Sequence, residues 1–217
     1  KVMANLKTTT IDGGLSEKSG TDSTVASAII ATTPIVGTNV SYDSSNTVVY
    51  CSSVYDVNAD KIVVAYRDDT DGGVGKAVVG TIADEPSTTI TWGTPVTFSG
   101  RTAETAGGNV AAIGFAMSYD VVAQKVLICW MEGDTGVSGG KGASKVGTVS
   151  GTGTGGTIGF GSESEWEDDK SVAHRTFAEH IVYDSNAQKH VIIWYDPNYT
   201  GAVARVGTIT GTSVSWG

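Results

Sequence analysis

Cysteine is scarce in this chain, whose 217 residues contain only two, Cys51 and Cys129. A disulfide-rich secreted scaffold would contain more, and neither residue belongs to a C-x-x-C pair of the kind that binds zinc. The two cysteines therefore argue against a disulfide-rich scaffold and against a zinc site of the C-x-x-C kind. We therefore expect two buried free thiols.

Basic residues are also few. The chain has 14 Lys and Arg against 23 Asp and Glu, which gives a formal net charge of −9 at pH 7. A nucleic-acid partner is usually bound by clustered Lys and Arg, so we expect none. No apolar run approaches the roughly 20 residues that a membrane-spanning helix needs, so we expect no membrane insertion.

Motifs typical of catalysis are missing as well. The sequence contains no G-x-S-x-G, H-E-x-x-H or P-loop pattern, and no turn of the S-x-D-x-G-x-x-W kind found in sialidase propellers. Its only histidines are His174, His180 and His190. A hydrolase needs a positioned nucleophile, base or carboxylate pair. We therefore expect no catalytic residues and no enzyme activity.

Glycine and strand-favouring residues are abundant instead. The chain has 29 Gly and only 17% charged residues, which predicts short strands joined by turns. One phrase occurs three times: VYDVNADKIVVAYRD from Val54, SYDVVAQKVLICWME from Ser118 and VYDSNAQKHVIIWYD from Val182. Each copy begins 64 residues after the one before it. So strict a period indicates a repeat architecture.

Each copy of the phrase predicts a β-hairpin in which Asp opens and Lys closes a short turn. A third strand containing Val-Gly-Thr follows. A fourth comes after it, with Trp or Phe before Gly, as in TTITWGTPVTF from Thr88. Four short antiparallel strands therefore make one repeat.

Such a unit cannot bury both of its faces alone, so neighbouring units must stack on it. We predict an all-β protein, a β-propeller-like array of four-stranded antiparallel blades, with a β-sandwich as the alternative. The predicted organisation is an N-terminal arm, 1–45, with strand near Val25 to Val36, and three tandem β repeats at about 46–108, 109–172 and 173–217.

The succession Tyr-Asp-x4-Lys, then Val-Gly-Thr, then Trp/Phe-Gly resembles tandem repeats in long proteins of marine phages, notably cyanophage tail and virion proteins, and in some bacterial surface proteins. The resemblance covers residues 46–217. It implies β-propeller-like modules for display or adhesion on a virion or outside the cell, and it implies no catalytic residues.

The loops between second and third strands are expected to share one rim with the connections between repeats. Asp68, Glu132 and Asp196 recur there, each two residues after an aromatic residue that we expect to be more buried. An aromatic ring beside hydrogen-bonding acids suits a sugar, whereas the alternative is that the aromatic packs between blades and the acid solvates the strand end. The predicted ligand-binding residues are Asp68, Asp69, Asp71, Glu132, Asp134, Trp166, Asp196 and Tyr199.

Asp68, Asp69 and Asp71 also offer hard oxygen ligands for a structural calcium ion, although the EF-hand spacing with its terminal Glu is missing. No other cofactor is expected.

The expected function is that of a non-catalytic structural or adhesive module of a virion or cell exterior, which binds surface glycans. A carbohydrate-active enzyme and a self-assembling extracellular filament subunit are the alternatives. The expected partners are other copies of the chain or neighbouring repeats.

The third repeat reaches only Trp216-Gly217, whereas the first continues as WGTPVTF. The segment TTPIV at 32–36 resembles the missing half. We therefore expect residues 1–45 to pair beside, or to continue, the last outer strand of another copy and so protect its edge. The alternative is a boundary within a longer array of repeats.

Overall fold

The computed structural model describes seven segments of the chain, which are residues 37–83, 89–99, 110–134, 141–151, 155–167, 180–196 and 201–217. One compact unit comprises Asn39–Gly217. The strand predicted near Val25 to Val36 lies outside the described residues. Within the seven segments there is no helix with the length and apolar character needed to cross a membrane.

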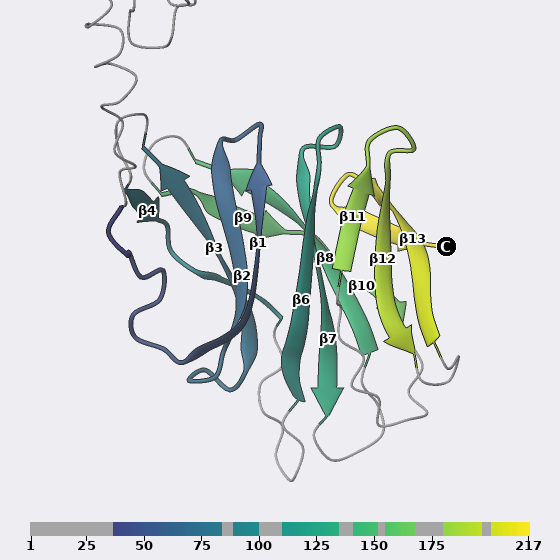
Figure 1. Cartoon of the computed structure of the whole chain (residues 1–217), viewed down its shortest axis with the longest axis horizontal. Coiled ribbons are helices and arrows are strands. Elements are labelled where there is room, and N and C mark those ends of the chain that lie inside the picture. The colour runs from purple at the N-terminus through teal and green to yellow at the C-terminus, as the bar shows by residue number, and fades with distance from the viewer. Residues whose placement is uncertain are drawn as a thin grey trace, which may run out of the picture. The chain divides into compact units, whose positions relative to one another are not determined.

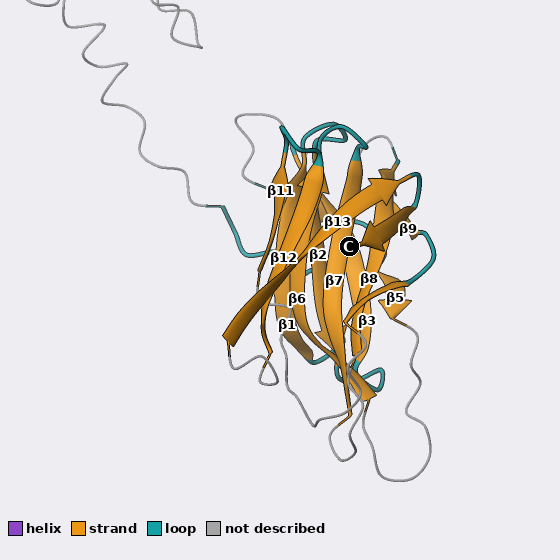
Figure 2. Ribbon diagram, turned by 90° about the vertical axis from the view of Figure 1, so that its right-hand side faces the viewer, coloured by secondary structure: helices purple, strands orange, loops and turns teal. Residues whose placement is uncertain are grey.

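The described residues form three antiparallel sheets, so the prediction of an all-β protein is confirmed. Figure 1 shows the sheets side by side, and Figure 2 views them from the side of sheet C. Sheet A contains β1 (Val48–Asp56), β2 (Lys61–Asp68), β3 (Val74–Ile82), β4 (Ile90–Trp92) and β5 (Val96–Ser99). Sheet B contains β6 (Val110–Asp120), β7 (Lys125–Asp134), β8 (Lys141–Ser150), β9 (Thr157–Phe160) and β10 (Ser164–Glu167). Sheet C contains β11 (His180–Asp184), β12 (Lys189–Asp196), β13 (Gly201–Thr210) and β14 (Ser213–Trp216).

The fourth strand of the repeat is broken in two. In sheet A, β4 pairs with one half of β3 and β5 pairs with the other half, and in sheet B, β9 and β10 pair with β8 in the same way. The break follows Trp92-Gly93 and Phe160-Gly161, which differs from the single fourth strand that the sequence predicts. In sheet C, β14 pairs with β13 from Gly207 to Thr210.

The three hairpin turns of the repeated phrase have one geometry. Oδ1 of Asp56 accepts hydrogen bonds from the backbone N–H groups of Asn58 and Ala59 at 3.0 and 2.9 Å. Asp120 and Asp184 bind the corresponding pairs of amides in their own turns. The residue before each Lys has a left-handed backbone, with φ of 55° to 57° at Asp60, Gln124 and Gln188. All three turns lie at the top of Figure 1.

The sheets bury their facing sides against each other, as alternation along a strand requires. Between sheets A and B, one apolar cluster includes Val63 of β2, Phe98 of β5 and Trp130 of β7. Between sheets B and C, a second cluster includes Leu127 of β7 and Trp194 of β12. The middle sheet is therefore covered on both faces.

Two glycines allow neighbouring sheets to approach closely. A Cβ built on Gly93 of sheet A would lie 2.0 Å from the carbonyl oxygen of Gly156 in sheet B. A Cβ on Gly161 of sheet B would lie 1.9 Å from the carbonyl oxygen of Thr212 in sheet C. Because backbone cannot move aside as a flexible side chain can, any larger residue at these positions would separate the sheets.

The cysteines differ in their surroundings. Cys129 is fully buried between sheets B and C, and burial raises the pKa of its thiol well above the usual value. Cys51 is exposed, so the expectation of two buried thiols is wrong for this residue. It lies at an irregularity of β1, where the pairing with β2 shifts between Val49 and Ser52.

Candidate functional site

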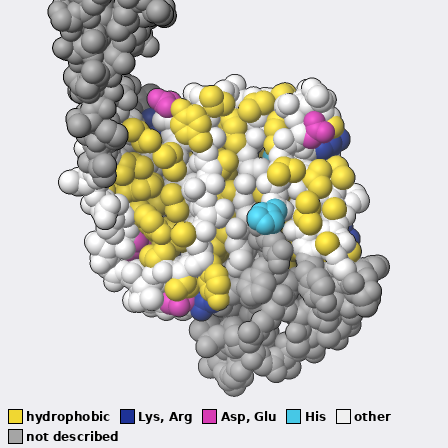
Figure 3. All heavy atoms as spheres, viewed as in Figure 1, with side chains coloured by type: hydrophobic (Ala, Val, Ile, Leu, Met, Phe, Trp, Pro, Cys, Tyr) yellow, Lys and Arg dark blue, Asp and Glu magenta, His cyan; other side chains and the backbone are white. Residues whose placement is uncertain are grey.

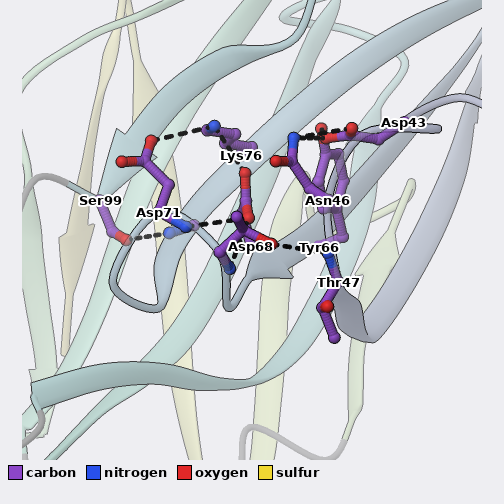
Figure 4. A network of polar contacts seen from close by, with 10 residues as sticks. Asp43, Asn46, Thr47, Tyr66, Asp68, Asp71, Lys76 and Ser99 are labelled. Carbon is purple, nitrogen blue, oxygen red and sulfur yellow. Dashed lines mark hydrogen bonds and ion pairs between the residues drawn. The ribbon is translucent and has the colours of Figure 1, made fainter.

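The predicted rim lies at the ends of the sheets opposite the three hairpin turns (Figure 1). In sheet A, the side chain of Asp68 is fully buried there at the end of β2. Its Oδ1 accepts hydrogen bonds from the amides of Thr70 and Asp71 at 2.9 and 3.1 Å, and its Oδ2 lies 2.7 Å from Lys76 Nζ. Figure 4 shows this network. Asp68 therefore shapes the loop rather than facing solvent.

The neighbouring acids are also paired with cations. Asp71 lies 3.0 Å from Lys76 Nζ, and Asp69 lies 2.5 Å from Arg67 Nε. Burial by itself would lower the pKa of Lys76, but hydrogen bonds to Asp68 and Asp71 outweigh burial and raise it. Lys76 therefore stays charged, and Asp69 and Asp71 remain exposed enough to accept hydrogen bonds from a ligand.

A second network reaches the buried aromatic of sheet A. The hydroxyl of Tyr66 donates to Asp43 Oδ2 at 2.8 Å, and Asn46 donates to the same carboxylate (Figure 4). Burial of Asp43 alone would raise its pKa, but the hydrogen bonds from Asn46 and Tyr66 outweigh burial and lower it. Burial and the Asp43 carboxylate both raise the pKa of Tyr66.

Sheet B has an acidic group of its own at this rim. Lys141 Nζ, on β8, lies 2.7 Å from Glu163, 2.8 Å from Glu165 and 3.8 Å from Glu132. Burial by itself would lower the pKa of Lys141, but its hydrogen bonds to Glu163 and Glu165 outweigh burial and raise it. One charged lysine thus gathers three carboxylates, of which Glu165 is the most exposed.

Apart from Asp69 and Asp71, which lie in the exposed part of the loop, the predicted site residues divide into three groups. Asp68 and Glu132 lie at equivalent places, as the 64-residue period requires, but both are buried, so the acids are not clearly more exposed than the aromatics Tyr66 and Trp130. Trp166 is fully buried, and its Nε1 donates to the carbonyl of Ala143 at 2.8 Å, so its ring is not a surface platform. Asp134 and Asp196 end β7 and β12, but their side chains, like all of Tyr199, lie outside the described residues.

The residues proposed for calcium are paired with cations and backbone amides in this structure. Asp68 is occupied by Lys76 and two backbone amides, and Asp69 is occupied by Arg67. In the described segments, no group of three or more His, Cys, Asp and Glu side chains has the arrangement of a metal site. The carboxylates of DDTDGG therefore hold the loop through lysine and arginine.

An exposed aromatic that the sequence analysis did not single out lies beside this rim. Tyr50 has a left-handed backbone, φ 51°, which is unusual for a bulky residue and typical of strained positions near functional sites. Its ring lies 5.9 Å from the guanidinium of Arg67, which also binds Asp69. Tyr50 is 50% exposed to solvent. The sequence carried no signal for it, because the other repeats lack an aromatic at this position.

A second group that the sequence analysis missed lies inside, between sheets B and C. Ser118 Oγ is 2.8 Å from His190 Nδ1, and His190 Nε2 is 3.5 Å from Asp120 Oδ2. A signal was present, since Ser118 and His190 replace residues that are apolar in the other repeats. All three side chains are buried, so this Ser-His-Asp group has no open approach for a substrate. Its role in the described structure is packing.

The chain matches no protein-family model, and a search of curated proteins finds no match.

Proposed function

We propose that the protein is a non-catalytic, β-propeller-like repeat module of the marine-phage and bacterial-surface kind, serving structure or adhesion on the exterior of a virion or cell, where it binds surface glycans. The observation that carries the proposal is how the recurring residues are used. In all three repeats the turn Asp binds its own loop, and the aromatics Tyr66, Trp130 and Trp194 are buried, Trp130 and Trp194 between sheets and Tyr66 against Tyr42 and Trp92. The repeated residues thus serve folding, which is typical of a structural scaffold.

The stacking of the sheets supports a propeller-like arrangement. Each sheet is antiparallel and has its strands in sequence order, and the first strands of the repeats, β1, β6 and β11, lie next to one another. Propeller blades share these features, because their first strands line the centre of the ring.

The rim of sheet A supports glycan binding. It combines the exposed ring of Tyr50 with the carboxylates of Asp69 and Asp71 and the charged Arg67 and Lys76. A sugar ring has apolar faces that stack on an aromatic side chain and hydroxyl groups that bind carboxylates. Tyr50 thereby takes the place that the sequence analysis assigned to Trp166.

A glycan array probed with the 217-residue chain tests this proposal. The variant Tyr50→Ala with Asp69→Ala is expected to lose at least about tenfold in affinity for the glycans that bind the unaltered chain. Val122→Ala, at an exposed position in a hairpin turn at the other end, is the control and should bind normally. Failure to bind any glycan, equal loss in the control, or hydrolysis of a bound glycan would contradict the proposal.

A further inference from the structure

Three aromatic pairs in this structure have nearly the same geometry. Phe98 of β5 packs against Trp130 of the following sheet at 5.0 Å between ring centroids, and Trp166 of β10 packs against Trp194 at 5.1 Å. In both, the second half of a broken fourth strand places its aromatic on the next sheet. Tyr42 packs against Tyr66 of sheet A, also at 5.1 Å. Tyr42 therefore occupies the place of a fourth-strand aromatic from a sheet before sheet A.

The sequence around Tyr42 supports this equivalence. Residues 93–99 read GTPVTFS, residues 161–167 read GSESEWE, and residues 37–43 read GTNVSYD. Each begins with Gly and has its aromatic residue in sixth place, where Phe98, Trp166 and Tyr42 lie. This alignment begins at Gly37 and differs from the one expected from the sequence, which placed TTPIV at 32–36 in the missing half-strand. The segment at 37–43 therefore has the pattern of a second half of a fourth strand.

Sheet C lacks such a half-strand in the described part of the chain. The first halves of β3 and β8 pair with β5 and β10, respectively. The corresponding half of β13, Gly201–Ala204, pairs with β12 on one side and has no described strand on the other. An unpaired edge of this kind readily accepts another strand.

The outer face of sheet C is equivalent to the faces of sheets A and B that the next sheet covers. Val63 and Val79 of sheet A, and Leu127 and Val146 of sheet B, are buried by the sheet that follows. The same face of sheet C exposes Val182 at 57%, Ile193 at 41% and Val206 at 46%. Figure 3 shows hydrophobic side chains gathered over sheet C at the right and over sheet A at the left. Both outer faces thus have apolar surface available for contact.

At the turn end of the sheets, a tyrosine of one sheet lies beside the turn aspartate of the sheet before it. Tyr119 of sheet B is buried beside Asp56 of sheet A, and Tyr183 of sheet C lies beside Asp120 of sheet B. The equivalent tyrosine of sheet A, Tyr55, is 50% exposed and donates to Asp60 in its own turn, at 2.5 Å. Asp184 of sheet C is exposed. One further interface of the same kind would join Asp184 to Tyr55.

We propose that sheet C docks on sheet A of a second copy of the chain and takes residues 39–43 of that copy as its missing half-strand against β13. Tyr42 of the second copy then stays packed on Tyr66 of its own chain. It makes there the same aromatic contact that Phe98 and Trp166 make at the other two interfaces. Val182 meets Ile62 of the second copy, as Val54 and Val126 contribute to one cluster between sheets A and B.

Two copies close this head-to-tail contact into a ring. A heterologous interface gives a closed ring or an open filament, depending on the rotation between copies. The three sheets that the described residues of one chain form make six in a dimer, which lies within the roughly 4–8 blades of known propellers. Assembly in this way does not depend on glycan binding at the rim.

Light scattering on the 217-residue chain tests the stoichiometry. The expected mass is twice the 22.3 kDa of one chain. Val206→Lys, on the outer face of sheet C, should raise the dissociation constant of the dimer at least about tenfold, because the lysine would have to be buried. Val122→Lys, at an equally exposed turn position, should leave it unchanged. A monomer, an open polymer or an unaffected Val206→Lys dimer would overturn the proposal.

Cross-linking tests the orientation without weakening the contact. In a Cys51→Ser background, a short bis-maleimide should link chains that carry both Tyr55→Cys and Asp184→Cys into covalent dimers, because Cys129 is buried. Chains with either substitution alone should not cross-link. Dimers from Asp184→Cys alone would show that two C sheets meet each other, and absence of dimers from the double variant would overturn the head-to-tail contact.

Discussion

Ser118 of sheet B and His190 of sheet C face each other across the boundary between their sheets, with Ser118 Oγ 2.8 Å from His190 Nδ1. The equivalent positions between sheets A and B are occupied by Val54 and Val126. At this pair of positions the two interfaces therefore differ: the pair is polar between sheets B and C and apolar between sheets A and B. We expect this polar pair to favour one register between sheets B and C, because any other register would leave it buried without a partner.

The buried histidine predicts a pH dependence of stability. Burial lowers the pKa of His190 below its ordinary 6.5, although Asp120 opposes that shift. The folded protein then binds fewer protons than the unfolded chain, so His190 contributes full stability above about pH 6.5 and loses it as the pH falls below that value. Tyr183, whose pKa burial and Asp120 raise to about 12, stays neutral throughout this range.

Urea unfolding at pH 7.5 and pH 5.5 measures this effect. The unaltered chain should be less stable at pH 5.5, and His180→Gln, at an exposed histidine, should show the same difference. Equal stability at the two pH values would show that His190 is not the titrating group.

The double variant Ser118→Val with His190→Val is predicted to remove this pH dependence. It gives the boundary between sheets B and C the valine pair of the boundary between sheets A and B. His190→Val alone should cost about 1–3 kcal/mol of unfolding free energy, because it leaves the Ser118 hydroxyl buried without its partner. The double variant should recover most of that loss at pH 7.5. A double variant less stable than the single one would contradict the interpretation.

Asp120 and Asp184 are expected to contribute unequally to stability although their turns match. In the single chain, at concentrations too low for copies to associate, Asp184→Ala removes two turn hydrogen bonds at an exposed site and should cost about 0.5–1.5 kcal/mol. Asp120→Ala also removes the carboxylate beside Tyr183 and His190, so it should cost about 1.5–3 kcal/mol. Thermal and urea unfolding of the two variants, with Asn186→Ala as control, gives the comparison. Equal losses would mean that the contact between repeats contributes nothing.

Gly161→Ala should be strongly destabilising, because its Cβ would lie 1.9 Å from the carbonyl oxygen of Thr212 in the next sheet. We expect a loss of at least about 1–3 kcal/mol, the usual cost of overpacking. Gly159→Ala is the matched control two residues away, since a Cβ there would meet nothing within 4 Å. Denaturant midpoints distinguish the two variants, and similar midpoints would show that the sheets can separate at little cost.

The repeat made much of the fold predictable. Three hairpins with their Asp-opened turns follow from local chemistry, because Asp side chains bind nearby amides whatever surrounds them. The burial of Tyr66, Trp130 and Trp194 followed from the period together with the need of each sheet to cover its faces. The break in the fourth strand was not predicted, since it depends on how closely Gly93 and Gly161 approach the neighbouring sheets.

The candidate site was less predictable. Asp68 and Glu132 were found from the period, but the period does not distinguish an acid that binds a ligand from one that a lysine holds inside. Trp166 was placed on the rim because it lies in an acidic connection, yet its neighbours in the fold bury it completely. Tyr50 was missed because its exposure results from a local irregularity in the pairing of β1.

The sequence by itself determined the three hairpins, their turns and the positions that repeat, because these depend on residues near each other along the chain. Only the tertiary structure decided which residues meet across sheets. Ser118 and His190 are 72 residues apart, and their contact arises from stacking of sheets B and C, whereas Tyr42 and Tyr66 are 24 apart and meet because the segment before β1 packs on sheet A. Burial depends on this tertiary packing. For this reason an acid or an aromatic residue can be buried in one repeat while the same type of residue is exposed in another.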